Sequence, residues 1–465
     1  MSIINFLNFI FWFILCYLTF VSLVYIFLLL ATIVEVLNKF LESQEGNISC
    51  LMKKINLPPV TLLVPTYNEE KSVMETIYSI IKSDYPNKFI IIINDGSTDG
   101  TLKVLTEKLA LHSVTPIIPT YIPIIGEITG QYISKLHQNI IVIDKKNGGT
   151  GDALNVGVNA SRTPMFISID ADTLIEPKAV SELVFKMLSQ PHTLAVGGSV
   201  YLLNGCRYKD GEILEEKIPS GLVSSIQILE YLGSFSFNRL GWNILGGAMS
   251  FSGANTLFER KAVLEIGGFQ TNSNAQDFEV ITHLHKHSIE NHFPYRIDYT
   301  PTAATWTDVP STFKEYWNQR SNWQIGSLKS LLTHKAMLFN PKYGKVGLFN
   351  YPFYLFVEVL GCVVEFIGYI AVFTSWYIGI LSFSALLMYL ALCWGILALL
   401  SMTCVLMNVI TYNKYKRLRY VPIFLLLSIF QTVGFRQFDV LCRVTASLKY
   451  FWLSLKNREN KKNLS

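Results

Sequence analysis

Apolar residues dominate both ends of the chain, and a more polar region separates them. Residues 3–37 are almost uninterrupted Leu, Ile, Phe and Val, and Glu35 is the first acid. A helix of this composition is long enough to cross a bilayer. A signal peptide would have a basic start and a shorter apolar core, and this sequence has neither. The pattern predicts an N-terminal transmembrane helix over residues 1–40, followed by a polar linker over residues 41–57.

Short apolar runs that end in polar residues recur along residues 58–310. The four clearest runs are Val60–Val64, Phe89–Ile93, Ile140–Ile143 and Phe166–Ile169. Helical patterns separate these runs, so they predict βαβ units around a parallel sheet, in an α/β domain. Residues 109–135 contain three prolines and two glycines and are predicted to form a surface loop.

Residues 311–346 mix aromatic and basic side chains at helical spacing. Phe313, Tyr316 and Trp317 alternate there with Lys314 and Arg320. Amphipathic helices of this kind lie along a membrane surface. The apolar pattern then returns over residues 347–412, which predicts two transmembrane helices.

A basic loop over residues 413–420 contains Lys414, Lys416, Arg417 and Arg419. Basic loops beside membrane helices face the cytoplasm. The two preceding spans then place residues 58–310 in the cytoplasm as well, and the chain is predicted to be a multi-pass protein of the cell membrane. Residues 421–465 are predicted to form a re-entrant or interfacial hairpin, or one last span, with a basic tail.

Composition narrows the class of protein. Half of the 465 residues are hydrophobic and 16% are charged, which fits a soluble domain joined to membrane segments. The net charge of +5 is too small to indicate a nucleic-acid partner. The seven cysteines form no CxxC pair, which argues against a disulfide framework or a zinc site.

Two carboxylates, Asp170 and Asp172, follow the apolar run Phe166–Ile169. Residues just past a strand lie where open α/β sheets hold ligands. Divalent cations such as Mg²⁺ take one or two carboxylates together with phosphates of the substrate. No GxGxxG or GxxxxGK[ST] motif is present. The sequence therefore favours a phosphorylated ligand held by a carboxylate-bound metal, with a solvated acidic turn as the alternative.

Two further features have ordinary structural explanations. His283, His285 and His287 include a pair that could share a helix face, but a solvated helix surface is the more common arrangement. Asp277 lies at the predicted start of a helix, where an aspartate often serves only as a cap.

Short motifs from the N-terminal to the C-terminal part of the chain form one ordered set. They are Val64-Pro65-Thr66-Tyr67-Asn68-Glu69, Asn94-Asp95-Gly96-Ser97-Thr98-Asp99, Asn147-Gly148-Gly149 with Ala153-Leu154-Asn155, Asp170-Ala171-Asp172, Ser252-Gly253-Ala254, Gly267-Gly268-Phe269, Asp277, and Gln319-Arg320 with Trp323. The ordered set resembles the membrane-bound, processive family-2 glycosyltransferases. That group contains the cellulose, chitin, hyaluronan and poly-N-acetylglucosamine synthases, and the bacterial cell-wall-biogenesis members are the most similar.

This resemblance implies a GT-A domain inserted between transmembrane helices, and a role for each matching residue. Asp95 resembles the aspartate that contacts the uracil ring, and Asp277 matches the general base. Asp170 and Asp172 resemble the pair that serves the nucleotide and its Mg²⁺ or Mn²⁺. The remaining matches fall at the donor nucleotide (Thr66, Tyr67, Glu69 and Asn147) and at the acceptor and diphosphate (Gln319, Arg320 and Trp323).

The implied activity is an inverting, processive transfer of N-acetylglucosamine or glucose. The donor would be a UDP-sugar, and the acceptor a growing β-linked polysaccharide at the membrane. Two alternatives remain open: transfer of a single sugar to a lipid-linked acceptor, and a catalytically weakened, nucleotide-binding scaffold of an export complex. Membrane lipids and an accessory export subunit are the other expected partners.

Three positions depart from the family pattern. Gln276 replaces an acidic residue, Asn322 replaces an arginine and Thr150 replaces a lysine. Two cations near the phosphates are therefore missing. Either Arg320, Lys145 or Lys146 compensates for them, or the affinity for the donor is reduced.

Overall fold

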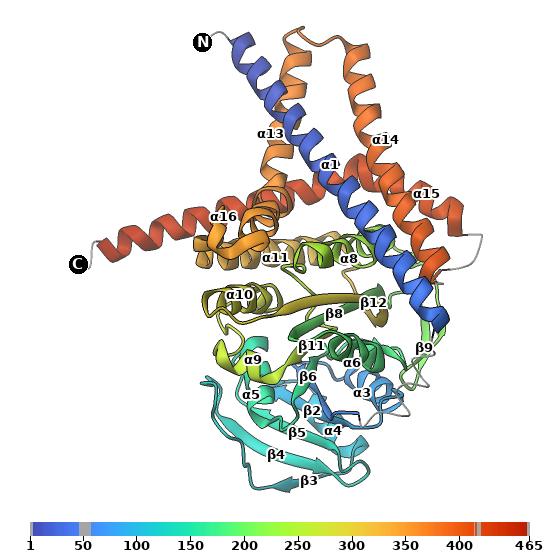
Figure 1. Cartoon of the computed structure of the whole chain (residues 1–465), viewed down its shortest axis with the longest axis vertical. Coiled ribbons are helices and arrows are strands. Elements are labelled where there is room, and N and C mark those ends of the chain that lie inside the picture. Colours follow the sequence, from blue (N-terminus) through green and yellow to red (C-terminus); the bar gives the residue numbers. More distant parts are fainter. Residues whose placement is uncertain (1–2, 46–56, 413, 416–419, 463–465) are drawn as a thin grey trace.

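The computed structural model describes residues 3–45, 57–412, 414–415 and 420–462, and Figure 1 shows an α/β part beneath a layer of apolar helices. Residues 46–56 lie outside the described residues, so most of the predicted linker does too. The same holds for residues 413 and 416–419 of the predicted basic loop and for residues 463–465 of the tail.

One mixed sheet of ten strands forms the centre of the α/β part, in the order β3-β4-β5-β2-β1-β6-β11-β8-β12-β7. The strands are β1 (Val60–Thr66), β2 (Lys88–Asp95), β3 (Leu111–Val114), β4 (Ile128–Ser134), β5 (Ile140–Lys145), β6 (Met165–Ser168), β7 (Thr173–Ile175), β8 (Thr193–Leu202), β11 (Thr256–Glu259) and β12 (Arg296–Thr307). A separate hairpin pairs β9 (Arg207–Lys209) with β10 (Glu212–Glu215).

The four strands predicted from apolar runs lie side by side as β5-β2-β1-β6. All three pairings among them are parallel, which confirms the α/β interpretation. Leu62, Ile92 and Ile167 are fully buried, as expected for strands that helices cover on both faces. The carboxyl ends of these strands therefore meet at one edge of the sheet.

The sheet is not purely parallel, and residues 109–135 are not a loop throughout. β3 and β4 fall within that range; they pair with each other as antiparallel strands, and β4 is also antiparallel to β5. β11 is also antiparallel to both of its neighbours. Most residues of β3, at the sheet edge, and of β4, beside it, are only half-buried or exposed, so these strands contain no long apolar run that a sequence pattern would reveal.

Helices cover both faces of the sheet. They are α3 (Val73–Ile81), α4 (Thr101–Lys108), α5 (Thr150–Ala160), α6 (Ala179–Ser189), α7 (Leu222–Gly233), α8 (Arg239–Trp242), α9 (Arg260–Glu265) and α10 (Gln276–Glu290).

Helix α5 carries three buried polar side chains that fasten surrounding segments. Asn155 forms two hydrogen bonds with the backbone of Phe269, at 2.8 and 2.9 Å. Asn159 bonds the backbone of Ile122, and Asp152 accepts the amide of Ile125 at 2.7 Å. The excursion between β3 and β4 is thereby fixed to the helix that begins beside the predicted ligand edge.

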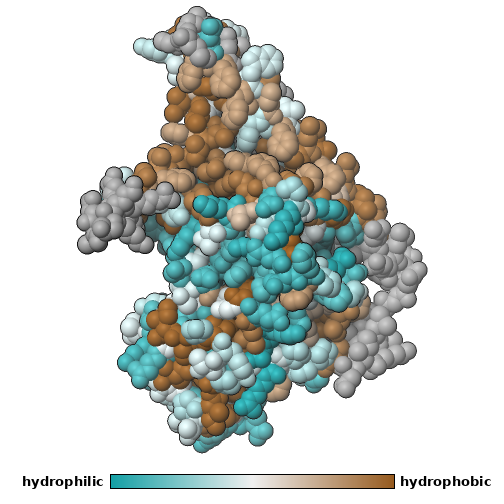
Figure 2. Space-filling model, turned by 60° about the vertical axis from the view of Figure 1, so that its left-hand side comes forward, coloured by the Kyte–Doolittle hydropathy of each residue, from teal (hydrophilic) through white to brown (hydrophobic). Residues whose placement is uncertain are grey.

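The upper layer contains the apolar helices. They are α1 (Ile3–Glu45), α13 (Gly361–Tyr377) and α14 (Phe383–Met407), and Figure 2 shows hydrophobic side chains gathered over this region. Among the described residues, Asn5–Leu37 and Tyr420–Lys456 are long and apolar enough to cross a membrane. The pair Val346–Val359 and Gly361–Tyr377, bent by 44°, would make a third span. The protein is therefore membrane-associated.

Helices α15 (Tyr420–Phe430) and α16 (Arg436–Lys462) adjoin a π-helical turn, Gln431–Phe435. Gly434 breaks the helical path there with a φ of 97°. Figure 1 shows α16 running across the directions of α13 and α14, beneath the apolar layer. The alternatives of a span and an interfacial segment for residues 421–465 both remain predictions.

Helix α11 (Phe313–Thr333) lies between α10 and α16. Its Tyr316 hydroxyl donates to Asp439 of α16 at 3.0 Å. Gln324 of α11 donates to Ser447 of α16, also at 3.0 Å. Polar contacts thus join the α/β part to the helices above it.

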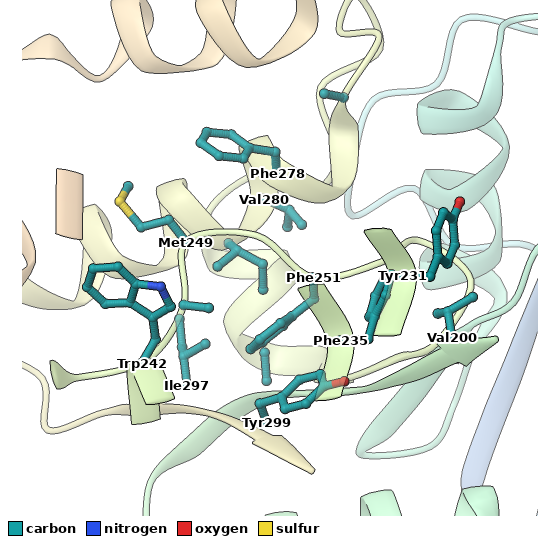
Figure 3. Packing of buried hydrophobic residues seen from close by; sticks show 14 of the residues in the cluster. Val200, Tyr231, Phe235, Trp242, Met249, Phe251, Phe278, Val280, Ile297 and Tyr299 are labelled. Carbon is teal, nitrogen blue, oxygen red and sulfur yellow. The ribbon is translucent and has the colours of Figure 1, made fainter. Parts of the chain in front are cut away.

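An aromatic cluster fills the space between the sheet and the upper layer (Figure 3). The rings of Phe251 and Tyr299 lie 6.0 Å apart at their centroids. Tyr354 lies between Trp242 of α8 and Phe278 of α10, at 5.9 and 5.8 Å. The start of α10 is therefore packed against segments that reach the membrane layer.

The buried amide of Asn155 provides a test of this scaffold. We expect Asn155→Ala to lower the free energy of unfolding by about 2–3 kcal/mol, because the N–H and C=O groups of Phe269 lose their partner. Thermal unfolding in detergent measures the change. Asn291→Ala, at an exposed helix end, is the matched control, and equal shifts for the two variants would contradict the assignment.

Candidate active site

The two aspartates of the Asp170-Ala171-Asp172 segment occupy the turn between β6 and β7. Asp172 Oδ1 accepts hydrogen bonds from Thr173 Oγ1 at 3.2 Å and from Thr307 Oγ1 at 3.1 Å. Thr76 Oγ1 donates to the carbonyl of Ala171 at 2.8 Å. The turn is therefore held from three sides, and its carboxylates have little freedom to move.

Asp277 lies in the first turn of α10 and shares a cavity with Asp170. The cavity is lined by Pro65, Thr150, Leu154, Ser168, Asp170, Ser252, Gly253, Thr256, Phe258, Phe269, Gln276 and Asp277. Gly253 lies between the two carboxyl groups. A Cβ at that glycine would be 3.8 Å from Asp277 Cβ and 3.9 Å from Asp170 Oδ1. Segments far apart in the sequence thus bring two predicted site residues together.

The charges of this cavity are poorly compensated within the protein. Burial, together with the charges of Asp172, Asp277 and Glu69, raises the pKa of Asp170 to about 7. Burial also raises the pKa of Asp172 and that of Asp277. Asp308 has a raised pKa from burial and from the charge of Asp172. Like charges in a low-dielectric site resist ionisation, so binding of a cation would be favourable here.

The donor set fits a divalent cation that also takes ligands from a substrate. Asp170 and Asp172 offer carboxylate oxygens, which Mg²⁺ and similar ions prefer. Among the described residues, no group of three or more His, Cys, Asp or Glu side chains is arranged to hold a metal. A complete protein cage is therefore not built there, whereas an ion shared with phosphate oxygens needs only one or two carboxylates.

The Asp95 carboxylate organises the loop Asn147–Gly149. It accepts from Lys145 Nζ at 2.5 Å and from the amides of Gly148 and Gly149 at 2.9 and 2.8 Å. Asn147 Nδ2 donates to the Asp95 carbonyl at 2.9 Å. Lys145 also pairs with Asp152 at 2.8 Å, with both side chains fully buried. Most lone pairs of Asp95 are thus used inside the protein, and its contact with a nucleobase remains a prediction.

The end of β1 provides the other predicted donor residues. Thr66 is its last residue and is buried, whereas Tyr67 is half exposed. Ser72 donates to the Glu69 carboxylate, and burial raises the pKa of Glu69. The charge of Asp172 also raises it, which indicates that these carboxylates lie near each other.

Gln319, Arg320 and Trp323 belong to α11 and do not line the cavity of Asp170 and Asp277. Arg320 pairs with Glu230 of α7 at 2.5 Å, and its guanidinium lies 4.6 Å from the Trp323 ring. The side-chain oxygen of Gln319 is buried, and no residue that the structure describes hydrogen-bonds to it. Their role at the acceptor and diphosphate remains a prediction.

The cations expected to compensate for the missing family residues are already paired. Arg320 binds Glu230, and Lys145 binds Asp95 and Asp152. Lys146 pairs with Glu127 at 2.7 Å on the exposed surface. Arg320 and Lys145 are thus held in buried or half-buried ion pairs, whereas the exposed pair of Lys146 is a weak one.

The histidines do not gather as one group. His285 contacts the Tyr295 hydroxyl at 2.9 Å and the Ala248 carbonyl at 3.2 Å. His283 faces His334, with ring centroids 5.3 Å apart, and both approach Glu279. His287 contacts Asn291. The expected solvated helix surface is therefore wrong for His285, whose ring is fully buried and hydrogen-bonded inside the fold.

Several residues of the cavity were not singled out as site residues by the sequence. Ser252 and Gly253 line it, and the small-residue run from Gly246 to Asn255 was the available signal. Asp308 and Arg239 do not line the cavity, but the charge of Asp172 affects Asp308 and the charge of Arg239 affects Asp277; neither residue lies in a motif.

Comparison with known proteins defines first the class and then the family. The fold is similar to that of a mannosyltransferase from Pyrobaculum calidifontis in complex with GDP-Man and Mn²⁺. The TM-score is 0.50 at 17% identity, covering 88% of this chain and 98% of that one. The fold is thus of the GT-A type. The chain belongs to the glycosyl transferase family group 2, whose model matches residues 165–434, and a glycosyl transferase family 2 model matches residues 61–118.

Two curated relatives are named poly-β-1,6-N-acetyl-D-glucosamine synthase. The protein from Staphylococcus epidermidis is 27% identical over 295 residues, which is 63% of this chain and 61% of that protein. The protein from Staphylococcus aureus strain COL is 27% identical over 277 residues, or 59% and 56%. The matched region thus spans less than two thirds of either relative.

The buried ion pairs of Lys145 provide a stability test of the loop. We expect Lys145→Met to lower the free energy of unfolding by about 3–5 kcal/mol, because the carboxylates of Asp95 and Asp152 are left buried without their partner. Thermal unfolding measures it. Lys146→Met, which breaks only an exposed pair, should leave the midpoint nearly unchanged, and similar midpoints for the two variants would contradict this assignment.

Proposed function

We propose that this protein is an inverting, processive glycosyltransferase. It would transfer N-acetylglucosamine from UDP-N-acetylglucosamine to a growing β-linked polysaccharide at the membrane. The observation that carries the proposal is the cavity shared by Asp170 and Asp277 at the carboxyl ends of the parallel strands. The names of the relatives support N-acetylglucosamine as the sugar and a β-1,6 linkage as the first product to test.

Asp170 and Asp172 would hold Mg²⁺ or Mn²⁺ together with the diphosphate of the donor. The raised pKa of Asp170 supports this role, because its neighbouring negative charges favour a bound cation. When bound, the cation offsets the negative charge that develops on the departing diphosphate. The Mn²⁺ present in the mannosyltransferase of similar fold is consistent with such a site.

Asp277 would act as the general base. Its carboxylate takes the proton from a hydroxyl of the acceptor, and the hydroxyl oxygen attacks the anomeric carbon of the donor sugar. A bond from the acceptor oxygen to that carbon forms while the bond to the diphosphate breaks, and UDP leaves. Attack from the opposite side inverts the configuration, so an α-linked donor yields a β-linked product.

The donor nucleotide would lie along the ends of β1, β2 and β5. Thr66, Tyr67, Glu69, Asp95 and Asn147 are the residues proposed to surround it. Since Asp95 accepts the amides of Gly148 and Gly149, it would shape the nucleotide loop as well as face the base.

The acceptor would approach from the side of α11. Trp323 has an exposed ring that can stack on a sugar, and Gln319 and Arg320 precede it on the same helix. The domain would face the cytoplasm in a multi-pass protein, where activated sugars are available. Membrane lipids and an accessory export subunit are proposed partners.

Product analysis separates this function from its alternatives. Membranes containing the protein are incubated with radiolabelled UDP-N-acetylglucosamine and Mg²⁺ or Mn²⁺, and the products are separated by size. A ladder or long polymer is expected. One lipid-linked species would indicate single-sugar transfer. No UDP release from any UDP-sugar would indicate a scaffold.

We expect Asp277→Asn to reduce transfer by about 10²–10⁴-fold, because an amide cannot take the proton from the acceptor. Metal-dependent binding of UDP should persist, and calorimetry with UDP checks it. Glu265→Gln, a change at an exposed ion pair, is the control. Near-normal turnover by Asp277→Asn would refute the assignment of the base.

Loss of a residue that only supports a metal ligand typically weakens metal binding by about 10–100-fold. We expect Asp172→Asn to weaken metal-dependent UDP binding by more than this, because a direct ligand of the metal is lost. Titration with Mn²⁺ and UDP, with a chelator as reference, measures the change. Asp210→Asn, in an exposed turn, should bind as the unchanged protein does. Unaltered affinity in Asp172→Asn would exclude it as a ligand.

A further inference from the structure

Several cations of the protein are held in ion pairs with carboxylates. Arg320 pairs with Glu230, Lys145 with Asp95 and Asp152, and Lys414 with Glu176. Asp170, Asp172 and Asp277 would meet a nucleotide diphosphate, which is also negative. One divalent cation leaves part of this charge unbalanced, so a further positive group near the cavity would stabilise the bound donor.

Arg239 differs from these cations, because no carboxylate pairs with it within the part of the chain that the structure describes. Its Nε donates to the Ser250 carbonyl at 3.0 Å and a terminal nitrogen donates to Ser234 Oγ at 3.1 Å. Its guanidinium lies 3.9 Å from the Phe235 ring centroid. The side chain is thus oriented by neutral partners, and its charge is not used in an ion pair.

Two routes connect Arg239 with the cavity. The Ser250 carbonyl that it holds is two and three residues before Ser252 and Gly253, which line the cavity beside Asp277. The charge of Arg239 also lowers the pKa of Asp277, against the larger effect of burial, so its field reaches that carboxylate.

Tyr231 lies on the same stretch of chain as Arg239. Burial raises the pKa of its hydroxyl to about 12, and the charges of Arg320 and Arg239 oppose this shift. Phe235 follows one turn later, 5.4 Å from Tyr231, and Arg239 follows Phe235. Tyr231, Phe235 and Arg239 therefore follow one another along one face of the α7–α8 segment.

The backbone that carries Arg239 is firmly held. It follows a π-helical turn, Ser234–Asn238, a feature that is rare and often found at functional sites. Asn238 donates to Glu358 at 3.3 Å and accepts from Trp242 at 3.0 Å. Gly241 packs so closely on α1 that a Cβ there would lie 2.8 Å from the Leu28 carbonyl oxygen. These contacts thus hold the backbone on both sides of Arg239.

We propose that Arg239 is a donor-binding residue whose guanidinium offsets the negative charge of the donor diphosphate. This inference rests on the proposed function, since it presupposes a nucleotide diphosphate in the cavity. It takes the place that Arg320, Lys145 and Lys146 were expected to fill, and it requires no change in their ion pairs.

The test compares binding of UDP and of uridine, with Mn²⁺ present, to the full-length protein in detergent. Arg239→Gln should raise the Kd of UDP by about 10- to 100-fold, as for loss of a hydrogen bond to a charged group, and leave the affinity for uridine unchanged. Arg239→Lys keeps the charge but not the planar guanidinium. Its Kd for UDP should lie between that of the unchanged protein and that of Arg239→Gln. Arg260→Gln, at an arginine that donates to the Val158 carbonyl, is the matched control.

Each outcome is informative. Loss of uridine and UDP binding together in Arg239→Gln would mean that the residue only supports the fold, and would overturn the proposal. Unchanged UDP binding with an altered acceptor KM would overturn it as well. If the unchanged protein binds no UDP in the presence of Mn²⁺, the proposed function itself fails. A selective loss of UDP affinity, partly restored in Arg239→Lys, supports the proposal.

Discussion

The repulsion between buried carboxylates is the interaction on which the rest of the site depends. Asp170 and Asp277 share one cavity, and Asp172 stands on the same turn as Asp170. Burial of such groups is costly unless a cation or a protonated state relieves it. The fold nevertheless keeps these carboxylates buried together. Ionisable groups in such unfavourable surroundings are common at sites that bind a charged ligand.

The scaffold that maintains this arrangement is largely polar and buried. Asn155 and Asp152 tie α5 to neighbouring segments, and Lys145 links two carboxylates beneath the loop that begins the helix. The aromatic cluster around Trp242 and Phe278 then joins the start of α10 to the membrane layer. A displacement of the membrane helices would therefore also displace Asp277, because packed side chains connect these helices to the start of α10 among the described residues.

The sequence predicts those elements that a continuous run of apolar residues marks. The strands Val60–Thr66 and Lys88–Asp95 are apolar on both faces, so their burial and parallel pairing follow from composition. β3, at the sheet edge, and its neighbour β4 are half-exposed strands without such a run, and the sequence analysis therefore missed them. Asp170 and Asp277 stand in motifs and were found. Arg239 was not, because its relation to the cavity depends on how α8 packs beneath α1. The pairing of Arg320 with Glu230 likewise joins helices that no local pattern relates.

The most direct test of the central claim is an electron cryomicroscopy structure of the protein with UDP-N-acetylglucosamine and Mn²⁺. We expect the cation to lie between the carboxylates of Asp170 or Asp172 and the diphosphate, with Asp277 facing the anomeric carbon of the sugar. A nucleotide bound away from this cavity, or a cation coordinated by other side chains, would contradict the account.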